Sequence, residues 1–182
     1  MLNKLNIKKV DFKIYEILKE FNEKYKINIK DIDITELNLN NIGIGNGGLK
    51  YINKLKFKEL KELDLSKNEI SDIKILEKVN FRELEILNLS HNKISNLKVL
   101  QKVKLEKLEI LNLSENLISD IEVLENVDFK ELNISGNRIS NIKVLENIKF
   151  KELKNLNLSD NRLYNMNVFE KVKFEKLEKL YL

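Results

Sequence analysis

Three consecutive segments of this chain align with one another without a gap, and this repetition limits the possible fold more than any other feature. The segments begin at Leu60, Leu84 and Leu108 and read LKELDLSKNEISDIKILEKVNFRE, LEILNLSHNKISNLKVLQKVKLEK and LEILNLSENLISDIEVLENVDFKE. Each follows the pattern L-x-x-L-x-L-x-x-N-x-I with a period of 24 residues. A period between about 20 and 50 residues is typical of solenoids, in which each unit buries its apolar side against its neighbours.

Marker asparagines give the number of units. They are Asn68, Asn92, Asn116, Asn137 and Asn161. The steps between them are 24, 24, 21 and 24 residues, so the unit that ends at Asn137 is three residues short. Phe129, Leu132 and Ile134 still fill the leading apolar positions of that unit. We therefore expect the deletion to lie in the loop that enters the strand, and the sheet to continue past it.

The repeat resembles the leucine-rich-repeat family, and within it the subclass of phosphatase regulators and internalins. The resemblance implies an α/β fold: an arc-shaped right-handed solenoid with a parallel β-sheet on its concave face, short helices on its convex face and an N-terminal helical cap. It also implies that the marker asparagines form a ladder between coils. A side-chain amide suits that role because it offers donors and an acceptor together to buried backbone groups.

Alternation within each unit predicts the strand. In ELDLS, Leu63 and Leu65 are expected to face inward, while Glu62 and Asp64 face outward. The return segment SDIKILEKVNF has apolar residues at helix-like spacing and predicts a short convex helix or 3-10 turn. Its expected N-terminal caps are Asp72, Asn96, Asp120, Asn141 and Asn165. An aromatic spine is expected from Phe57, Phe81, Phe129, Phe150 and Phe174, interrupted by Leu105.

The chain divides into residues 1–34, an N-terminal cap, and residues 35–182, a solenoid with one degenerate repeat, five regular repeats and a truncated last repeat. The cap contains an amphipathic helix at about residues 11–25 and a joining strand, INIKDIDI. The helix has one apolar stripe: Val10, Ile14, Ile17, Leu18, Phe21 and Tyr25. Glu16/Lys19 and Glu20/Lys24 are expected to pair on its exposed side. The final LEKLYL has no C-terminal cap after it, which indicates a fragment of a longer chain or an edge available for self-association.

The stretch GIGNGG, from Gly43 to Gly48, matches the dinucleotide-binding pattern G-x-G-x-x-G. In the repeat alignment these glycines lie where the degenerate unit leaves its strand and carries two extra residues. We therefore interpret the stretch as an irregular turn that needs backbone freedom. Nucleotide binding through Gly43, Gly45 and Gly48 is kept as a remote alternative.

Outward strand positions of a solenoid form its natural binding surface, and here they predict a protein or peptide partner on the concave sheet. The candidate contact residues are Glu62, Asp64, Ile86, Asn88, His91, Ile110, Asn112, Glu115, Glu131, Asn133, Asn155 and Asn157. Ile86 and Ile110 are the best hot-spot candidates, because adjacent apolar side chains there stand out on a polar strip. The alternative is that they are ordinary variation among exposed aliphatic residues.

Other functional classes find little support in the sequence. His91 is the only histidine and no cysteine is present, so no catalytic residues, metal site or cofactor are predicted. The net charge of +4 is small, and the columns lack interleaved aromatic residues, so neither nucleic acid nor membrane is an expected partner. An intracellular location is expected. The alternative function is a regulatory or targeting segment of a larger enzyme, such as a kinase or phosphatase-associated protein.

Overall fold

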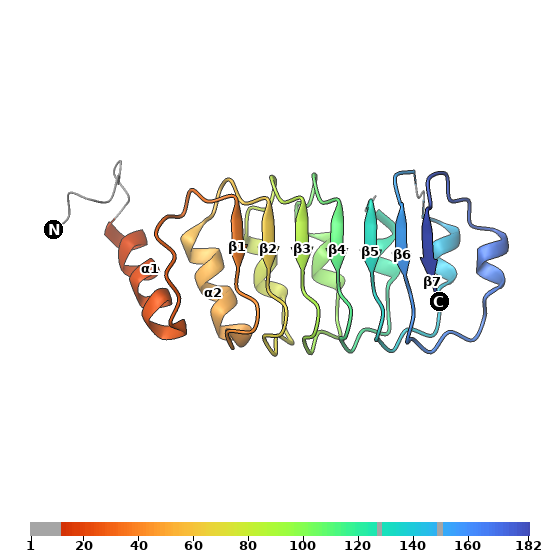
Figure 1. Ribbon diagram of the computed structural model, residues 1–182, viewed down its shortest axis with the longest axis horizontal. Helices are drawn as coiled ribbons and strands as arrows, with labels where there is room; N and C mark the ends of the chain where they lie inside the picture. The colour runs from red at the N-terminus through yellow and green to blue at the C-terminus, as the bar shows by residue number, and fades with distance from the viewer. Residues whose placement is uncertain (1–11, 127–128, 149–150) are drawn as a thin grey trace.

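A computed structural model describes residues 12–126, 129–148 and 151–182 of the chain. Seven short strands lie side by side in one sheet, in the order of the sequence (Figure 1). They are β1 (Glu36–Asn38), β2 (Glu62–Asp64), β3 (Ile86–Asn88), β4 (Ile110–Asn112), β5 (Glu131–Asn133), β6 (Asn155–Asn157) and β7 (Lys179–Tyr181). Every neighbouring pair is parallel, which confirms the predicted fold class.

The register of the sheet follows the sequence repeat residue by residue. Leu63 of β2 lies beside Leu87 of β3, and Leu87 lies beside Leu111 of β4. The short unit does not interrupt this register, because Ile110 pairs with Glu131 across the position of the deletion. The three missing residues therefore lie outside the strands, as the sequence predicted.

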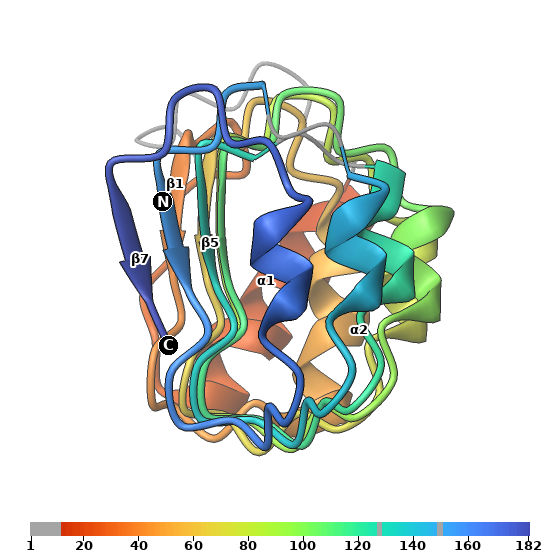
Figure 2. The ribbon, with the colours of Figure 1, turned by 90° about the vertical axis from the view of Figure 1, so that its right-hand side faces the viewer.

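The convex layer contains one α-helix and a row of 3-10 turns. It consists of α2 (Gly45–Leu55), η2 (Lys74–Lys78), η3 (Lys98–Gln101), η4 (Glu122–Asn126), η5 (Lys143–Glu146) and η6 (Asn167–Glu170). Figure 2 shows this layer on one side of the molecule and the sheet on the other. The regular repeats thus use the shorter of the two predicted conformations, and only the longer degenerate unit completes an α-helix.

Side-chain caps begin the 3-10 turns as expected. The Asp72 carboxylate accepts a hydrogen bond from the N–H of Lys74 at 2.9 Å. Equivalent bonds are made by Asn96, Asp120, Asn141 and Asn165. Each cap satisfies a backbone N–H that the short turn leaves unpaired.

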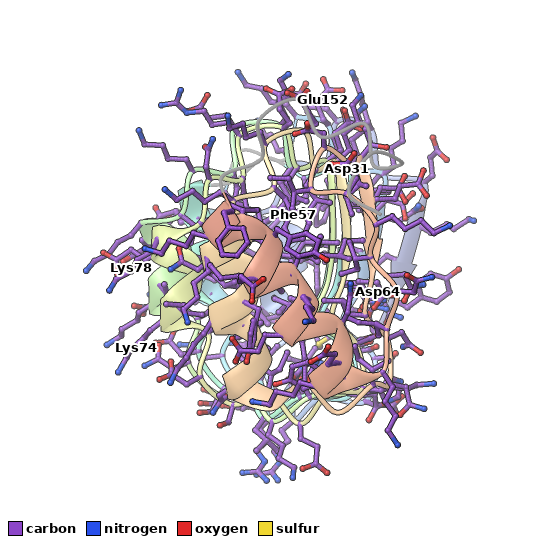
Figure 3. All side chains as sticks on the ribbon, turned by 90° about the vertical axis from the view of Figure 1, so that its left-hand side faces the viewer. Asp31, Phe57, Asp64, Lys74, Lys78 and Glu152 are labelled. Carbon is purple, nitrogen blue, oxygen red and sulfur yellow. The ribbon has the colours of Figure 1, made fainter. Side chains whose placement is uncertain are left out.

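One continuous apolar core fills the space between the two layers. Phe57, Phe81 and Phe129 are each 1% exposed, as expected for the spine. Figure 3 shows Phe57 between the layers and Asp64 on the outer side of the sheet. Phe174 is half-buried, and the predicted spine residue at position 150 lies outside the described residues. Full burial of such a side chain contributes about 1.5–3 kcal/mol, so the row is a major source of stability.

Each marker asparagine joins its own coil to the preceding one. Asn92 is representative: its Nδ2 donates to the carbonyl oxygens of Leu65, Leu89 and Ser90 at 3.0, 3.0 and 3.1 Å. Its Oδ1 accepts from the N–H groups of Asn68 and Ile70 at 3.1 and 2.9 Å. Asn68, Asn116, Asn137 and Asn161 make corresponding bonds. The buried backbone between coils is thereby satisfied.

Helix α1 (Phe12–Tyr25) covers the first coil by packing against α2. Phe21 is fully buried, and its ring stacks on Tyr51 with centroids 5.0 Å apart. The expected pairing of Glu20 with Lys24 is replaced by contacts to α2. Glu20 accepts a hydrogen bond from the Tyr51 hydroxyl, and the Lys24 ammonium lies 5.5 Å from the Tyr51 ring centre. The hydrogen bond and burial raise the pKa of Tyr51 to about 12.

The joining strand predicted at residues 27–34 is wrong, because no strand forms there and the sheet begins at β1. Asn22 of α1 binds the backbone of this segment instead. Its Nδ2 donates to the Ile29 carbonyl at 2.8 Å, and its Oδ1 accepts from the Ile29 N–H at 2.9 Å. The four isoleucines of the segment pack against the core as a cover for the first coil.

Candidate functional site

Two rows of side chains point away from the core along the sheet, and we call the surface that they form the open sheet face. The first row contains Glu36, Glu62, Ile86, Ile110, Glu131, Asn155 and Lys179, and the second contains Asn38, Asp64, Asn88, Asn112, Asn133, Asn157 and Tyr181. Parallel register places the members of each row on adjacent strands, about 4.8 Å apart. All predicted contact residues except His91 and Glu115 belong to these rows.

Ile86 and Ile110 lie side by side in the register of β3 and β4. Both side chains are half-buried, and neither belongs to the apolar core. The two therefore form an apolar contact area near the middle of the sheet, open to a partner.

The asparagines of the second row have a structural role that the sequence analysis did not identify. Oδ1 of Asn112 accepts hydrogen bonds from the N–H and the hydroxyl of Ser114, at 3.0 and 2.8 Å. Asn88, Asn133 and Asn157 make the same bond to the serine N–H two residues later. The repeated N-x-S sequence was the available signal, since asparagine commonly accepts such a bond from its own backbone. A partner at this row would meet mainly the amide Nδ2 groups.

Charge on the open sheet face differs from that of the whole chain. From β1 to β6 the two rows contain four carboxylates, of Glu36, Glu62, Asp64 and Glu131, and no lysine or arginine. The Asp64 carboxylate is engaged with Ser66 and Asn88. The row just before the strands is neutralised internally, since ion pairs join Lys61 to Glu85, Glu109 to Lys130 and Lys154 to Glu178. The face is thus acidic around an apolar centre.

The family model described as "Leucine Rich repeats (2 copies)" matches residues 58–102 and 82–126, which contain the coils of β2, β3 and β4. A solved leucine-rich-repeat protein from Leptospira interrogans is 30% identical, with a TM-score of 0.58. That match covers 73% of this chain and 33% of the Leptospira chain. The chain is a leucine-rich-repeat protein.

Two further leucine-rich-repeat structures show the same fold. An internalin (inlF) from Listeria monocytogenes is 24% identical with a TM-score of 0.57, over 82% of this chain and 48% of the internalin. The ectodomain of the Arabidopsis thaliana membrane receptor kinase GASSHO1/SCHENGEN3, solved with CASPARIAN STRIP INTEGRITY FACTOR 2, is 21% identical. It has a TM-score of 0.55, over 83% of this chain and 18% of the ectodomain. No curated protein sequence matches the chain. The phosphatase-regulator and internalin-like subclass stays a prediction.

His91 and Glu115 lie just beyond the strands, where each leucine-rich repeat turns. Lys67, His91, Glu115 and Asp160 adopt φ values of 56°, 51°, 54° and 54°, and the equivalent Gly136 has φ 61°. The Glu115 carboxylate occupies the space above Gly136, because a Cβ atom at that glycine would lie 2.4 Å from Oε1. These side chains form a rim beside the open sheet face.

The glycine loop of the degenerate repeat makes its hydrogen bonds within the solenoid. Gly43 and Gly45 have φ values of 69° and 50°, as expected for an irregular turn. The N–H of Ile44 donates to Asn68 Oδ1, and the N–H of Gly45 donates to the Asn68 carbonyl, both at 3.1 Å. A Cβ atom at Gly48 would lie 2.3 Å from Cβ of Ile44, so glycine is required there for packing. Two amides that a phosphate cradle would use are thus already bonded.

The remaining surface offers few chemical groups of catalytic type. Two convex grooves of about 340 and 460 Å³ lie between successive 3-10 turns, away from the strands. Among the described residues there is no cluster of metal-ligating side chains and no helix with the length and apolarity to cross a bilayer. Hydrogen bonds to Glu83 and to Glu109 raise the pKa of Lys107 and of Lys130, respectively, and a hydrogen bond from Lys176 lowers the pKa of Glu152. None of these groups is a predicted contact residue.

Proposed function

We propose that this leucine-rich-repeat protein is an interaction module that binds a protein or peptide through its open sheet face. The proposal rests on Ile86 and Ile110, which form an apolar pair in register at the middle of the sheet. Half-exposed apolar side chains surrounded by polar ones are typical of binding hot spots. The Arabidopsis ectodomain, which shares the fold, was solved in complex with CASPARIAN STRIP INTEGRITY FACTOR 2.

A non-enzymatic role is part of this proposal. Leucine-rich-repeat proteins are generally interaction scaffolds, and an open strip of side chains does little to exclude water from a reacting group. Regulation or targeting of an enzyme, and an intracellular location, stay predictions. Self-association is also proposed, through the outer edge of β7, where Tyr181 and Leu182 are 51% and 55% exposed. Sedimentation velocity over a series of concentrations tests it.

The test of the main proposal is a random-peptide display selection on the purified chain. Selected peptides are then titrated against the wild type and against Ile86→Arg/Ile110→Arg. We expect the double variant to bind at least about tenfold more weakly, because two charged side chains would replace the apolar contact.

Tyr164→Arg/Met166→Arg is the matched control. It likewise replaces two apolar residues by arginine, but these are 77% and 39% exposed and lie beside η6, off the sheet. Peptides that bind the wild type and both double variants equally would contradict the proposal.

A further inference from the structure

Unpaired carboxylates flank the apolar pair on both sides. In the first row of the open sheet face, Glu62 precedes Ile86 and Glu131 follows Ile110, each on the adjacent strand. Both carboxylates are exposed, and among the described residues neither takes part in an ion pair. The neighbouring Glu85 and Glu109 differ, since lysines already neutralise them. A ligand that lies across β2 to β5 therefore meets negative charge, an apolar area and negative charge again.

The spacing of this row matches that of an extended peptide. With strands about 4.8 Å apart, the centre of the isoleucine pair lies about 7 Å from the position of Glu62. Glu131 lies three strands from Glu62, at about 14 Å. Alternate side chains of an extended peptide are about 6.6 Å apart, so residues i, i+2 and i+4 on one side span about 13 Å. Three such side chains can therefore face Glu62, the isoleucine pair and Glu131 together.

We propose that the open sheet face recognises an extended segment with the pattern basic-x-apolar-x-basic. The apolar side chain lies on Ile86 and Ile110, and the two basic side chains pair with Glu62 and Glu131. This inference rests on the proposed function and specifies the partner by charge and spacing. Charge complementarity of this kind gives an interface its selectivity and speeds association at low salt.

Fluorescence anisotropy with a short fluorescein-labelled peptide that contains Lys-Thr-Leu-Thr-Lys tests the pattern. We expect saturable binding that weakens at high salt, because screening reduces attraction between exposed charges. Peptides with Glu-Thr-Leu-Thr-Glu and Lys-Thr-Ser-Thr-Lys are each expected to bind at least about tenfold more weakly, through lost charge pairing and lost apolar contact respectively.

Charge exchange provides the decisive variant. Glu62→Lys/Glu131→Lys is expected to lose the Lys-Thr-Leu-Thr-Lys peptide and to gain the Glu-Thr-Leu-Thr-Glu peptide, which would also show that the variant is folded. Glu122→Lys/Glu170→Lys makes the same change in net charge on the convex turns η4 and η6, and is expected to behave like the wild type.

The results separate this inference from the proposed function. If display-selected peptides depend on Ile86 and Ile110 while the Lys-Thr-Leu-Thr-Lys peptide does not bind, or binds equally after charge reversal, the inference is overturned and the interaction module stands. If the selected peptides bind the Ile86→Arg/Ile110→Arg variant as tightly as the wild type, both the proposed function and this inference are overturned. Transfer of the acidic peptide to the charge-reversed variant supports both.

Discussion

The two ends of the solenoid carry the same kind of strand but differ in what covers them. At the N-terminal end, α1 and the segment at residues 27–34 close the first coil, and Leu37 of β1 is 5% exposed. At the C-terminal end of the described structure, Leu180 of β7 holds the equivalent position and is 37% exposed. The leucine contributes to stability only where another layer lies over it, so burial in this protein is a property of neighbouring coils more than of the repeat itself.

The largest loss of stability is expected from a substitution in the N-terminal cap. Replacing fully buried Phe21 by alanine is expected to cost about 3–5 kcal/mol of unfolding free energy, because a large ring is removed between α1 and α2. Urea denaturation measures the loss. Phe12→Ala in the same helix is the control: Phe12 is 76% exposed, and a change within about 0.5 kcal/mol is expected. Equal losses would show that the helix is not seated as described.

Equivalent leucines from the middle and the end of the sheet sharpen the comparison. Leu111→Ala should cost about 2–5 kcal/mol, because the residue is 1% exposed. Leu180→Ala should cost less than about 1 kcal/mol, since much of that side chain already contacts water. Both are measured by urea denaturation. Similar costs would mean that the C-terminal coil is covered in solution, for example by a second copy.

The asparagine ladder gives an intermediate effect. Asn116→Leu removes four hydrogen bonds at a buried position and should cost about 1–3 kcal/mol. Asn161→Leu removes the same set nearer the open end, where the residue is only partly buried, so a smaller loss is expected. Urea melts of the two variants test the order. A larger loss of unfolding free energy at Asn161 than at Asn116 would contradict the expectation that burial decreases toward the open end.

Tyr51 gives the smallest effect, which is confined to high pH. Its pKa is raised from 10.0 to about 12 by the Glu20 hydrogen bond and burial. The protonated form is favoured in the folded state, so this stabilisation is complete below pH 10 and disappears as the pH rises through 12. Spectroscopic titration of the phenol measures the pKa. In Tyr51→Phe the decline of stability over this range should be shallower; an unchanged decline would argue against the contact.

Most of the sheet could be predicted from two periods in the sequence. Apolar residues alternate with polar ones within each strand, and most of the strands recur every 24 residues, so only one register buries all the leucines. Leu63, Leu87 and Leu111 therefore aligned in the structure as in the sequence. The joining strand could not be judged in this way. Ile27 and Ile29, and again Ile32 and Ile34, have the spacing of a strand, but the step of three between the two pairs breaks the alternation. The contact of Asn22 with Ile29 shows where the backbone of this segment forms its hydrogen bonds.

The sequence predicted which residues lie on the candidate surface, but not which of them are engaged in hydrogen bonds or ion pairs. The pairing of Ile86 with Ile110 followed from the repeat alone. The engagement of Asn112 with Ser114 and the neutralisation of Glu109 by Lys130 depend on side-chain direction, which a repeat alignment does not contain. For the same reason the repeat alone does not show that Glu62 and Glu131 form no ion pair with another residue that the structure describes.

The ladder of amide bonds has a consequence for how such a chain can change over generations. Each asparagine bonds only to its own coil and to the coil before it, so every coil contains the side chain that joins it to its neighbour. Duplication or loss of one whole repeat in the gene would leave every remaining junction of the same kind. The length of the open sheet face can therefore change under selection independently of its residues, because coils can be added or removed while the packing of the interior stays the same.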